Sequence, residues 1–198
     1  MIPKRVRQFY MNLTDRFTED DRRYAESVLD DFEMSLFEKL SSSEKKHRVR
    51  VSRGFLNISQ EISDGVFDKE ELFTEESIYT ERLKNHIENN GTEGLEDFIL
   101  QNRDMLIKTG LLHDVGKSVK RINIIDKSII VILNKITSGR LRAVKNSKIQ
   151  CYYRHSEYSK NMLKDYIKDE KMLYIIENHH SDTDDMEILV FQVMDDRN

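Results

Sequence analysis

Residues that break helices are almost absent from this chain, and their scarcity limits the folds that are open to it. Proline occurs once, at Pro3, and seven glycines are scattered along 198 residues. Leucine, glutamate and lysine, which favour helix, make up much of the remainder. We therefore expect an all-α fold. The length suits one compact domain with a small appendage.

The net charge and the number of cysteines limit which binding partners and which cellular compartment we expect for the protein. The formal net charge is −4, which argues against a general nucleic-acid binder. Cys151 is the only cysteine, so we exclude a disulfide framework and interpret Cys151 as a small buried residue in a reducing compartment. The longest apolar run, residues 129–133, is far too short to cross a bilayer. We expect a soluble, cytoplasmic protein with neither a membrane partner nor a specific nucleic-acid partner.

The first 40 residues indicate a helical extension that packs on the core. Thr18 with Asp21 resembles a helix start, and apolar residues at helical spacing follow it. We expect the aromatic residues within 1–18 to pack against the main body. Ser41 with Glu44 fits a capping box that begins a new helix. The predicted boundaries are therefore 1–40 for the extension and 41–198 for the main domain.

The motif LLHDVGK, residues 111–117, concentrates the chemistry of the chain. A buried imidazole and carboxylate are costly unless they are paired, hydrogen-bonded or bound to a metal. Neighbouring positions of a helix point about 100° apart, so His113 and Asp114 can flank one ion. Lys117 lies over the same face, and Gly116 permits close approach of another group. A surface His-Asp pair at a helix end is the alternative, and these residues alone support both equally.

Other histidines stand at positions where helices can bring them together. His47 lies on the apolar face of the helix that begins at Ser41, although a lone histidine on such a face is usually a core residue. His155 is predicted in a turn, just before a helix capped by Ser156. The pair His179-His180 continues an apolar face, or is a favourable pair at a helix C-terminus. Asp195 lies near another helix C-terminus, where the dipole disfavours an acid, and so needs a different explanation.

The stretch from 117 to 148 is strongly basic. It holds nine lysines and arginines against one acid, Asp126, which gives a local charge of +8 on a net acidic protein. Its length favours helix. Such an excess of positive charge can attract an anionic substrate to a nearby site, or can be a solvated basic surface, and we weigh the two equally.

Imidazole and carboxylate ligands in this number suit iron, manganese, zinc, nickel or cobalt. Their order and local context resemble the HD-domain superfamily of metal-dependent phosphohydrolases. LLHDVGK matches the central motif of that family, and EKKHRVRV resembles its first-histidine helix. RHSEYSKNML resembles a further family segment, with Ser156 where proline is common and Ser159 where glycine is common. IIENHH and ILVFQVMDD resemble the second-metal histidine segment and the terminal aspartate helix, so the resemblance covers residues 41–196.

The resemblance implies an all-α helical bundle of the HD-domain type with two divalent transition metals at its centre. Iron or manganese is expected first, with nickel, cobalt or zinc as alternatives. The implied ligands of one metal are His47, His113, Asp114 and Asp195. Asp114 would bridge to a second metal on His155 and His179, with His180 on that metal or on the substrate.

The implied activity is hydrolysis of a nucleotide or other small phosphorylated substrate by a metal-activated water. The catalytic residues would be Asp114, Lys117 and His180, and the substrate-binding residues Lys117 and Arg121. A homodimer is compatible with this interpretation. The alternatives are an HD-type di-iron oxygenase and a non-catalytic metal- or nucleotide-binding signalling module.

The chain departs from the family pattern between the first histidine and the HD motif. The gap is longer than usual, so residues 56–104 are expected to include an insertion. Turn signals at Asp64-Gly65 and at 89–94 flank a charged segment that indicates one or two helices. His86 lies at a more usual distance from His113, but its context does not fit and we prefer His47. No GYP-type sequence follows His180, which argues against the cyclic-di-GMP subgroup.

Overall fold

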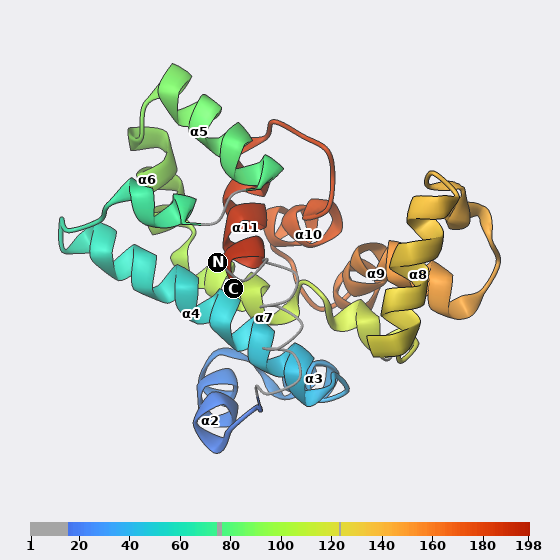
Figure 1. Ribbon diagram of the computed structural model, residues 1–198. Coiled ribbons are helices and arrows are strands. Elements are labelled where there is room, and N and C mark those ends of the chain that lie inside the picture. The colour runs from blue at the N-terminus through green and yellow to red at the C-terminus, as the bar shows by residue number, and fades with distance from the viewer. Residues whose placement is uncertain (1–15, 75–76, 123) are drawn as a thin grey trace.

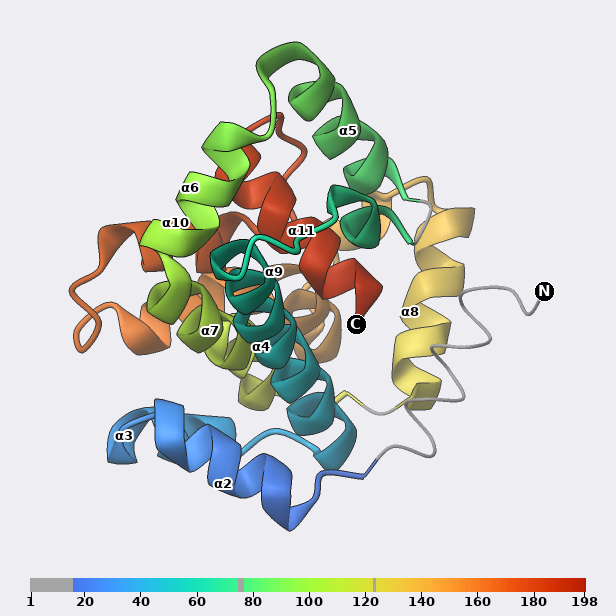
Figure 2. The same cartoon turned by 90° about the vertical axis from the view of Figure 1, so that its left-hand side faces the viewer.

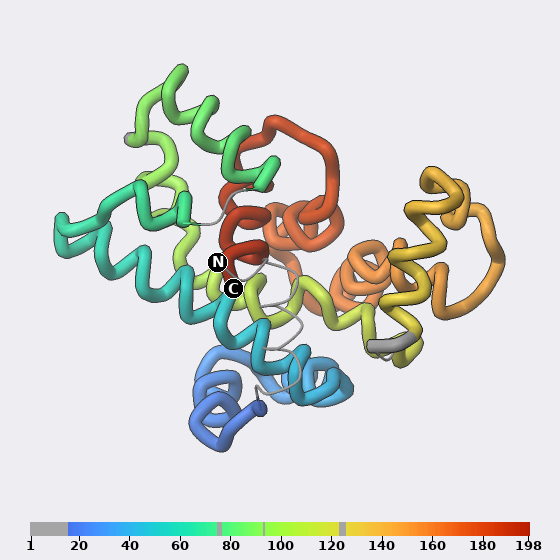
Figure 3. The backbone as a smooth tube through the Cα atoms, in the orientation of Figure 1, coloured from blue at the N-terminus to red at the C-terminus, as the bar shows by residue number. Residues whose placement is uncertain are grey.

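A computed structural model describes residues 16–74, 77–122 and 124–198, and every regular element in these ranges is a helix. The predicted all-α class is confirmed. The elements run in the order α2 Glu19–Val28, α3 Asp31–Phe37, α4 Ser42–Ser63, η1 Lys69–Phe73, α5 Ile78–Asn90, α6 Glu93–Gln101, α7 Arg103–Leu112, η2 Val115–Val119, α8 Ile124–Ile136, η3 Arg140–Ala143, α9 Ser147–Leu163, α10 Glu170–Asn178 and α11 Met186–Arg197 (Figures 1 and 3).

The long helix α4 and the shorter α7 form the centre of the bundle (Figure 2). Ser41 caps α4 and Glu44 completes the capping box, as the sequence predicts. The two helices touch at backbone level, because a Cβ on Gly110 would lie 2.8 Å from the Ser52 backbone. The Ser52 hydroxyl donates a hydrogen bond of 2.8 Å to the Ile107 carbonyl. This contact sets the distance between His47 on α4 and the HD motif at the end of α7.

Helices α2 and α3 pack across one end of α4 and α7 (Figure 2). Thr18 and Asp21 form the predicted capping box at the start of α2. The carboxylate of Asp21 is buried and also accepts hydrogen bonds from Lys46, at 2.8 Å, and Arg53, at 3.2 Å, on α4. Residues 1–15 of the predicted extension, which include Phe9 and Tyr10, lie outside the described residues. The division into extension and main domain remains a prediction.

The segment between α4 and α7 forms a helical layer over α11 (Figure 1). Positive φ angles at Gly65 (68°) and Gly91 (79°) make the turns that the sequence indicates at these positions. Between them, η1 and α5 present buried apolar side chains that join one cluster with Phe191 of α11. The layer thus covers the helix that carries Asp195.

Helix α9 begins earlier than the sequence predicted. Its N-cap is Asn146, whose side chain accepts from the backbone N–H groups of Lys148 and Ile149, so the helix is already established before Ser156. The expectation that His155 lies in a turn was therefore wrong: its ring is inside α9 and 7% exposed. Positions 151, 155, 159 and 163 form the buried stripe of this helix. Cys151 is buried on it, as expected.

Candidate metal centre

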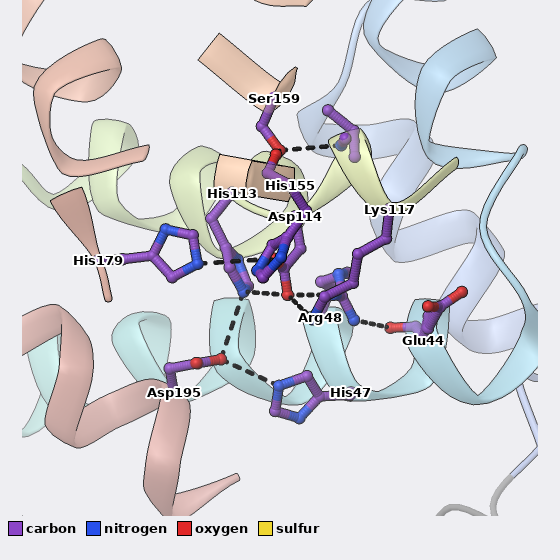
Figure 4. Close-up of polar contacts among 12 residues, drawn as sticks. Glu44, His47, Arg48, His113, Asp114, Lys117, His155, Ser159, His179 and Asp195 are labelled. Carbon is purple, nitrogen blue, oxygen red and sulfur yellow. Dashed lines mark hydrogen bonds and ion pairs between the residues drawn. The ribbon is translucent and has the colours of Figure 1, made fainter. Parts of the chain in front are cut away.

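The seven predicted ligands come together where α4, α9 and α11 meet the C-terminal ends of α7 and α10. Figure 4 labels these ligands except His180. Their ligand atoms form two groups, and within each group all atoms lie within 4.8 Å of one another. The groups are Asp114, His155, His179 and His180, and His47, His113 and Asp195. His86 lies on α5, outside both groups.

The HD motif lies at a helix end rather than inside a helix. Helix α7 stops at Leu112, His113 is its C-cap, and Asp114 leaves the helical region with φ −118° and ψ 15°. The chain turns sharply here because Gly116 lies against the backbone of α9. A Cβ on Gly116 would lie 2.5 Å from the Ser159 backbone nitrogen and closer still to the His155 carbonyl oxygen. The predicted close approach at Gly116 is thus confirmed, and it brings Asp114 beside His155.

Ser159 holds this junction together. Its hydroxyl accepts a hydrogen bond of 2.8 Å from the Gly116 backbone N–H and donates one of 2.9 Å to the His155 carbonyl. A serine at this position therefore bridges the two backbones that carry the ligands.

Backbone carbonyls orient three of the histidine rings. In each ring Nδ1 lies beside the carbonyl oxygen three residues earlier: His113 at 3.1 Å, His155 at 2.8 Å and His179 at 2.8 Å. A carbonyl oxygen only accepts, so Nδ1 carries the hydrogen in each of these bonds. The lone pair of the neutral ring is then on Nε2, which points into the centre, and this is the usual arrangement of a metal-binding histidine.

Asp114 lies between the two groups of ligands. Its Oδ1 atom is 3.0 Å from His155 Nε2 and 3.5 Å from His179 Nε2, while Oδ2 is 3.2 Å from His113 Nε2. Burial would raise the pKa of Asp114, but the charges of Lys117 and Arg48 outweigh it and hold the pKa well below its usual range. The carboxylate is therefore ionised, with one oxygen toward each group.

Asp195 joins the two histidines of the other group. Its Oδ1 atom is 3.0 Å from His47 Nε2 and 3.3 Å from His113 Nε2. Burial would raise the pKa of Asp195, but His113 and His47 hold it well below its usual range. These contacts explain an acid in the last turn of α11, where the helix dipole alone disfavours it.

The donor atoms fit a metal. Three of them, His113 Nε2, Asp114 Oδ1 and His179 Nε2, are fully buried and have no hydrogen-bonding partner among the described residues. Leaving such an atom unsatisfied costs about 1–3 kcal/mol, so each of the three needs a partner of another kind. Nitrogen and carboxylate donors in these two groups suit a divalent transition metal, which supplies that partner.

A cavity of about 500 Å³ opens onto the centre. Two tyrosines and five cationic side chains are among the residues that line it: Tyr152, Tyr153, Arg48, Arg50, Lys117, Lys127 and Arg142. Lys117 is in the predicted position, with Nζ 2.6 Å from Asp114 Oδ2. Arg121 is exposed and is not among the residues that line the cavity.

Arg48 is a residue of the site that was not predicted from the sequence. Its side chain is almost completely buried, forms an ion pair with Asp114 and donates a hydrogen bond of 2.9 Å to the Glu44 carbonyl (Figure 4). A signal was present, because Arg48 precedes Val51 by three residues and Phe55 by seven and so belongs to the buried face of α4. A charged residue on such a face needs a buried partner, and Asp114 is that partner.

Comparison with known proteins gave one match. A family model described as HD domain matches residues 46–196, which begin one residue before His47 and end one residue after Asp195. Neither the curated proteins nor the solved structures gave a match. Among the described residues, no helix is long and apolar enough to cross a membrane.

Proposed function

The chain belongs to the HD-domain family, and on this basis we propose that it hydrolyses a small phosphorylated substrate, such as a nucleotide. The family implies metal-dependent hydrolysis, and the histidine–aspartate cluster suits metal binding. The observation that carries the proposal is Lys117, whose ammonium group lies beside Asp114 at the inner end of a cavity lined by cations. Phosphoryl groups are the anions that such a combination of metals, lysine and arginine recognises.

The residues divide into two metal sites in this proposal. His47, His113 and Asp195 hold one divalent metal, and His155 and His179 hold the other, with Asp114 between them and His180 on the second metal or on the substrate. Iron or manganese is favoured, and nickel, cobalt or zinc would suit the same donors. Two such metals, when bound, lower the pKa of an attacking water and offset charge on a phosphoryl group.

Lys117 and His180 are the residues that meet the substrate. Lys117 is partly exposed, so its ammonium can turn from Asp114 to a phosphate oxygen and offset the charge that develops there. Desolvation first, and then the charge of His179, lowers the pKa of His180 to about 2. The ring of His180 therefore stays neutral and can accept a hydrogen bond or serve as a ligand. Arg48, held inside the protein, keeps Asp114 in place.

The test is hydrolysis of a panel of mono-, di- and cyclic nucleotides by protein loaded separately with iron, manganese and nickel. We expect phosphate or phosphomonoester release that is absent from the Asp114→Ala variant. If no metal and no member of the panel gives release above that variant, phosphohydrolase activity on nucleotides is wrong.

A di-iron oxygenase would use the same ligands. The cations that line the cavity and Lys117 have no role in that chemistry, so we rank it below hydrolysis. Oxygen uptake with a mixed-valent iron signal, in protein that releases no phosphate, would reverse the order.

A further inference from the structure

The cavity extends away from the metal centre, and the residues that line its far part have no role in the proposed hydrolysis. Lys127 and Asn134 of α8, Arg142 of η3 and Tyr153 of α9 line this part. In Figure 1, α8 and the η3 region stand together beside α9, apart from the helices that carry His47 and Asp195. We call these four residues the distal wall.

Two cations of the distal wall have no carboxylate partner within the described part of the chain. Among the other cations of the cavity, Arg48 and Lys117 both contact Asp114, and Arg50 donates to the Asn198 carbonyl at 3.1 Å. Lys127 and Arg142 form no ion pair with any described acid. Neither cation is therefore neutralised by a described carboxylate in direct contact with it.

The electrostatic environment of Lys127 agrees with that conclusion. Desolvation first, and then the charge of Lys117, lowers the pKa of Lys127. The ammonium groups of Lys127 and Lys117 repel each other electrostatically, and an anion bound near both would offset that repulsion.

Arg142 is held in position by its neighbours. Its guanidinium carbon lies 5.2 Å from the centroid of the Tyr153 ring, which is cation–π distance. The Tyr153 hydroxyl donates a hydrogen bond of 2.6 Å to Asn134 Oδ1, so the ring is itself tied to α8. Gln150 donates to the Arg142 carbonyl at 3.0 Å. Side chain and backbone are thus both supported, and binding an anion here costs less side-chain entropy than at a free surface arginine.

We propose that Lys127 and Arg142 form a second anion subsite for a phosphoryl group that is not cleaved. This inference rests on the proposed phosphohydrolase function and restricts its substrates to molecules with at least two phosphate groups. One phosphoryl group lies at the metal centre with Lys117, and another lies at the distal wall.

A binding experiment tests the subsite without turnover. Titration calorimetry on full-length, manganese-loaded protein compares orthophosphate with tripolyphosphate, for the parent chain and for the double variant Lys127→Gln/Arg142→Gln. We expect the double variant to bind tripolyphosphate about tenfold more weakly or worse, because it loses two charge-assisted contacts to the anion. Orthophosphate, which needs only the metal centre, should bind both proteins within about twofold.

Lys135→Gln is the matched control. It removes the same charge from the same helix, but Lys135, unlike Lys127, is not among the residues that line the cavity. It should leave both affinities unchanged. Equal losses in Lys135→Gln and in the double variant, or no loss in the double variant, would overturn the subsite. Unchanged circular dichroism and melting temperature confirm that all variants fold.

Kinetics separate this inference from the function on which it rests. With an active substrate, the double variant should raise KM for nucleoside diphosphates and leave kcat, and the KM for 4-nitrophenyl phosphate, unchanged. Hydrolysis with equal KM changes for both substrates would refute the subsite and leave the phosphohydrolase intact. Absence of all hydrolysis, with tripolyphosphate binding that still depends on Lys127 and Arg142, would refute the phosphohydrolase and leave the anion subsite.

Discussion

Arg48 and Asp114 form an ion pair in which the two side chains are 1% and 2% exposed. The guanidinium reaches the carboxylate from α4, on the side where Lys117 also makes contact. A permanent cation thus stands next to the acid that lies between the two groups of candidate ligands. It keeps Asp114 ionised in the apoprotein, and it leaves Oδ1 to the histidines.

Replacing Arg48 by methionine should destabilise the apoprotein by about 3 kcal/mol, because a buried carboxylate loses one of its two cations. Bound metal supplies positive charge at the same carboxylate, so the loss should be smaller in the loaded protein. Urea denaturation with and without manganese measures both values. Arg154→Met, which breaks an exposed pair with Glu157, should have no measurable effect in either state. A loss that metal does not reduce would show that Arg48 acts by packing alone.

Gly116→Ala should disrupt the junction between η2 and α9. The added methyl group meets the backbone of Ser159 and His155, which cannot turn aside as a side chain can. We expect a destabilisation of about 3 kcal/mol or more, together with weakened metal binding. Gly94→Ala is the control, since no atom lies within 4 Å of its Cβ and alanine favours helix. Thermal unfolding and metal titration of both variants measure these effects. Equal stability of the two variants would contradict a close contact between Gly116 and the backbone of α9.

The ligand assignment predicts metal content. Elemental analysis of the parent protein should give two metals per chain, and His155→Ala and His47→Ala should each lower that number. His86→Ala should keep both metals, because His86 lies outside the two ligand groups. If His86→Ala loses metal and His47→Ala does not, the first-histidine assignment is wrong.

Lys117→Gln should reduce kcat with metal content unchanged. Removing one group that stabilises developing charge in phosphoryl transfer typically costs about 10²-fold. Lys120→Gln removes an exposed charge from the same basic stretch and should keep the parent rate. An equal loss in both variants would mean that the general field of the segment, and not a contact by Lys117, supports turnover.

Acid should weaken the attachment of α2 through Asp21. Burial would raise the pKa of Asp21, but the hydrogen bonds from Lys46 and Thr18 outweigh it, so its folded pKa lies below the ordinary value of 3.8. The unfolded chain then binds more protons, and the stabilisation is complete above pH about 4 and lost as the pH falls through the folded pKa.

Asp21→Asn should therefore lower the free energy of unfolding by about 1–2 kcal/mol at neutral pH and flatten its acid dependence. Denaturant titrations between pH 7 and pH 3 measure both effects. Asp104→Asn, at an exposed pair with Arg103, provides the comparison. Parallel pH profiles for the parent and Asp21→Asn would contradict the role of this carboxylate.

Local signals predicted much of the fold because they act over three or four residues. The capping boxes at Thr18 and Ser41 and the glycine turns at 65 and 91 need no tertiary contact to be recognised. The same reasoning failed at Ser156, since a serine can cap a helix or continue one. Helix α9 is capped at Asn146, well before Ser156. The burial of the polar residues His155 and Ser159 of α9 depends on packing against Gly116, which the local sequence does not reveal.

The candidate ligands could be predicted because histidine is a scarce residue in this chain. Arg48 was missed because arginine is common. Six histidines leave few ways to arrange a ligand set, so order along the chain was informative. Arginine and lysine are usually solvated, so the place of Arg48 on the apolar face of α4 was overlooked while the exposed Arg121 was chosen. Of the basic stretch, Lys117, Lys127 and Arg142 reach the cavity. That selection depends on how η2, α8 and η3 turn in space.

Helix α9 holds Tyr152 and Tyr153 at the cavity and His155 at the centre, and both α8 and η3 pack on it. None of the seven predicted ligands lies between residues 124 and 143. Replacement of residues 124–143 would therefore change the lining of the cavity and leave all seven candidate ligands in the chain. The interval offers protein engineers a place to vary what the cavity admits while the histidines and aspartates stay the same.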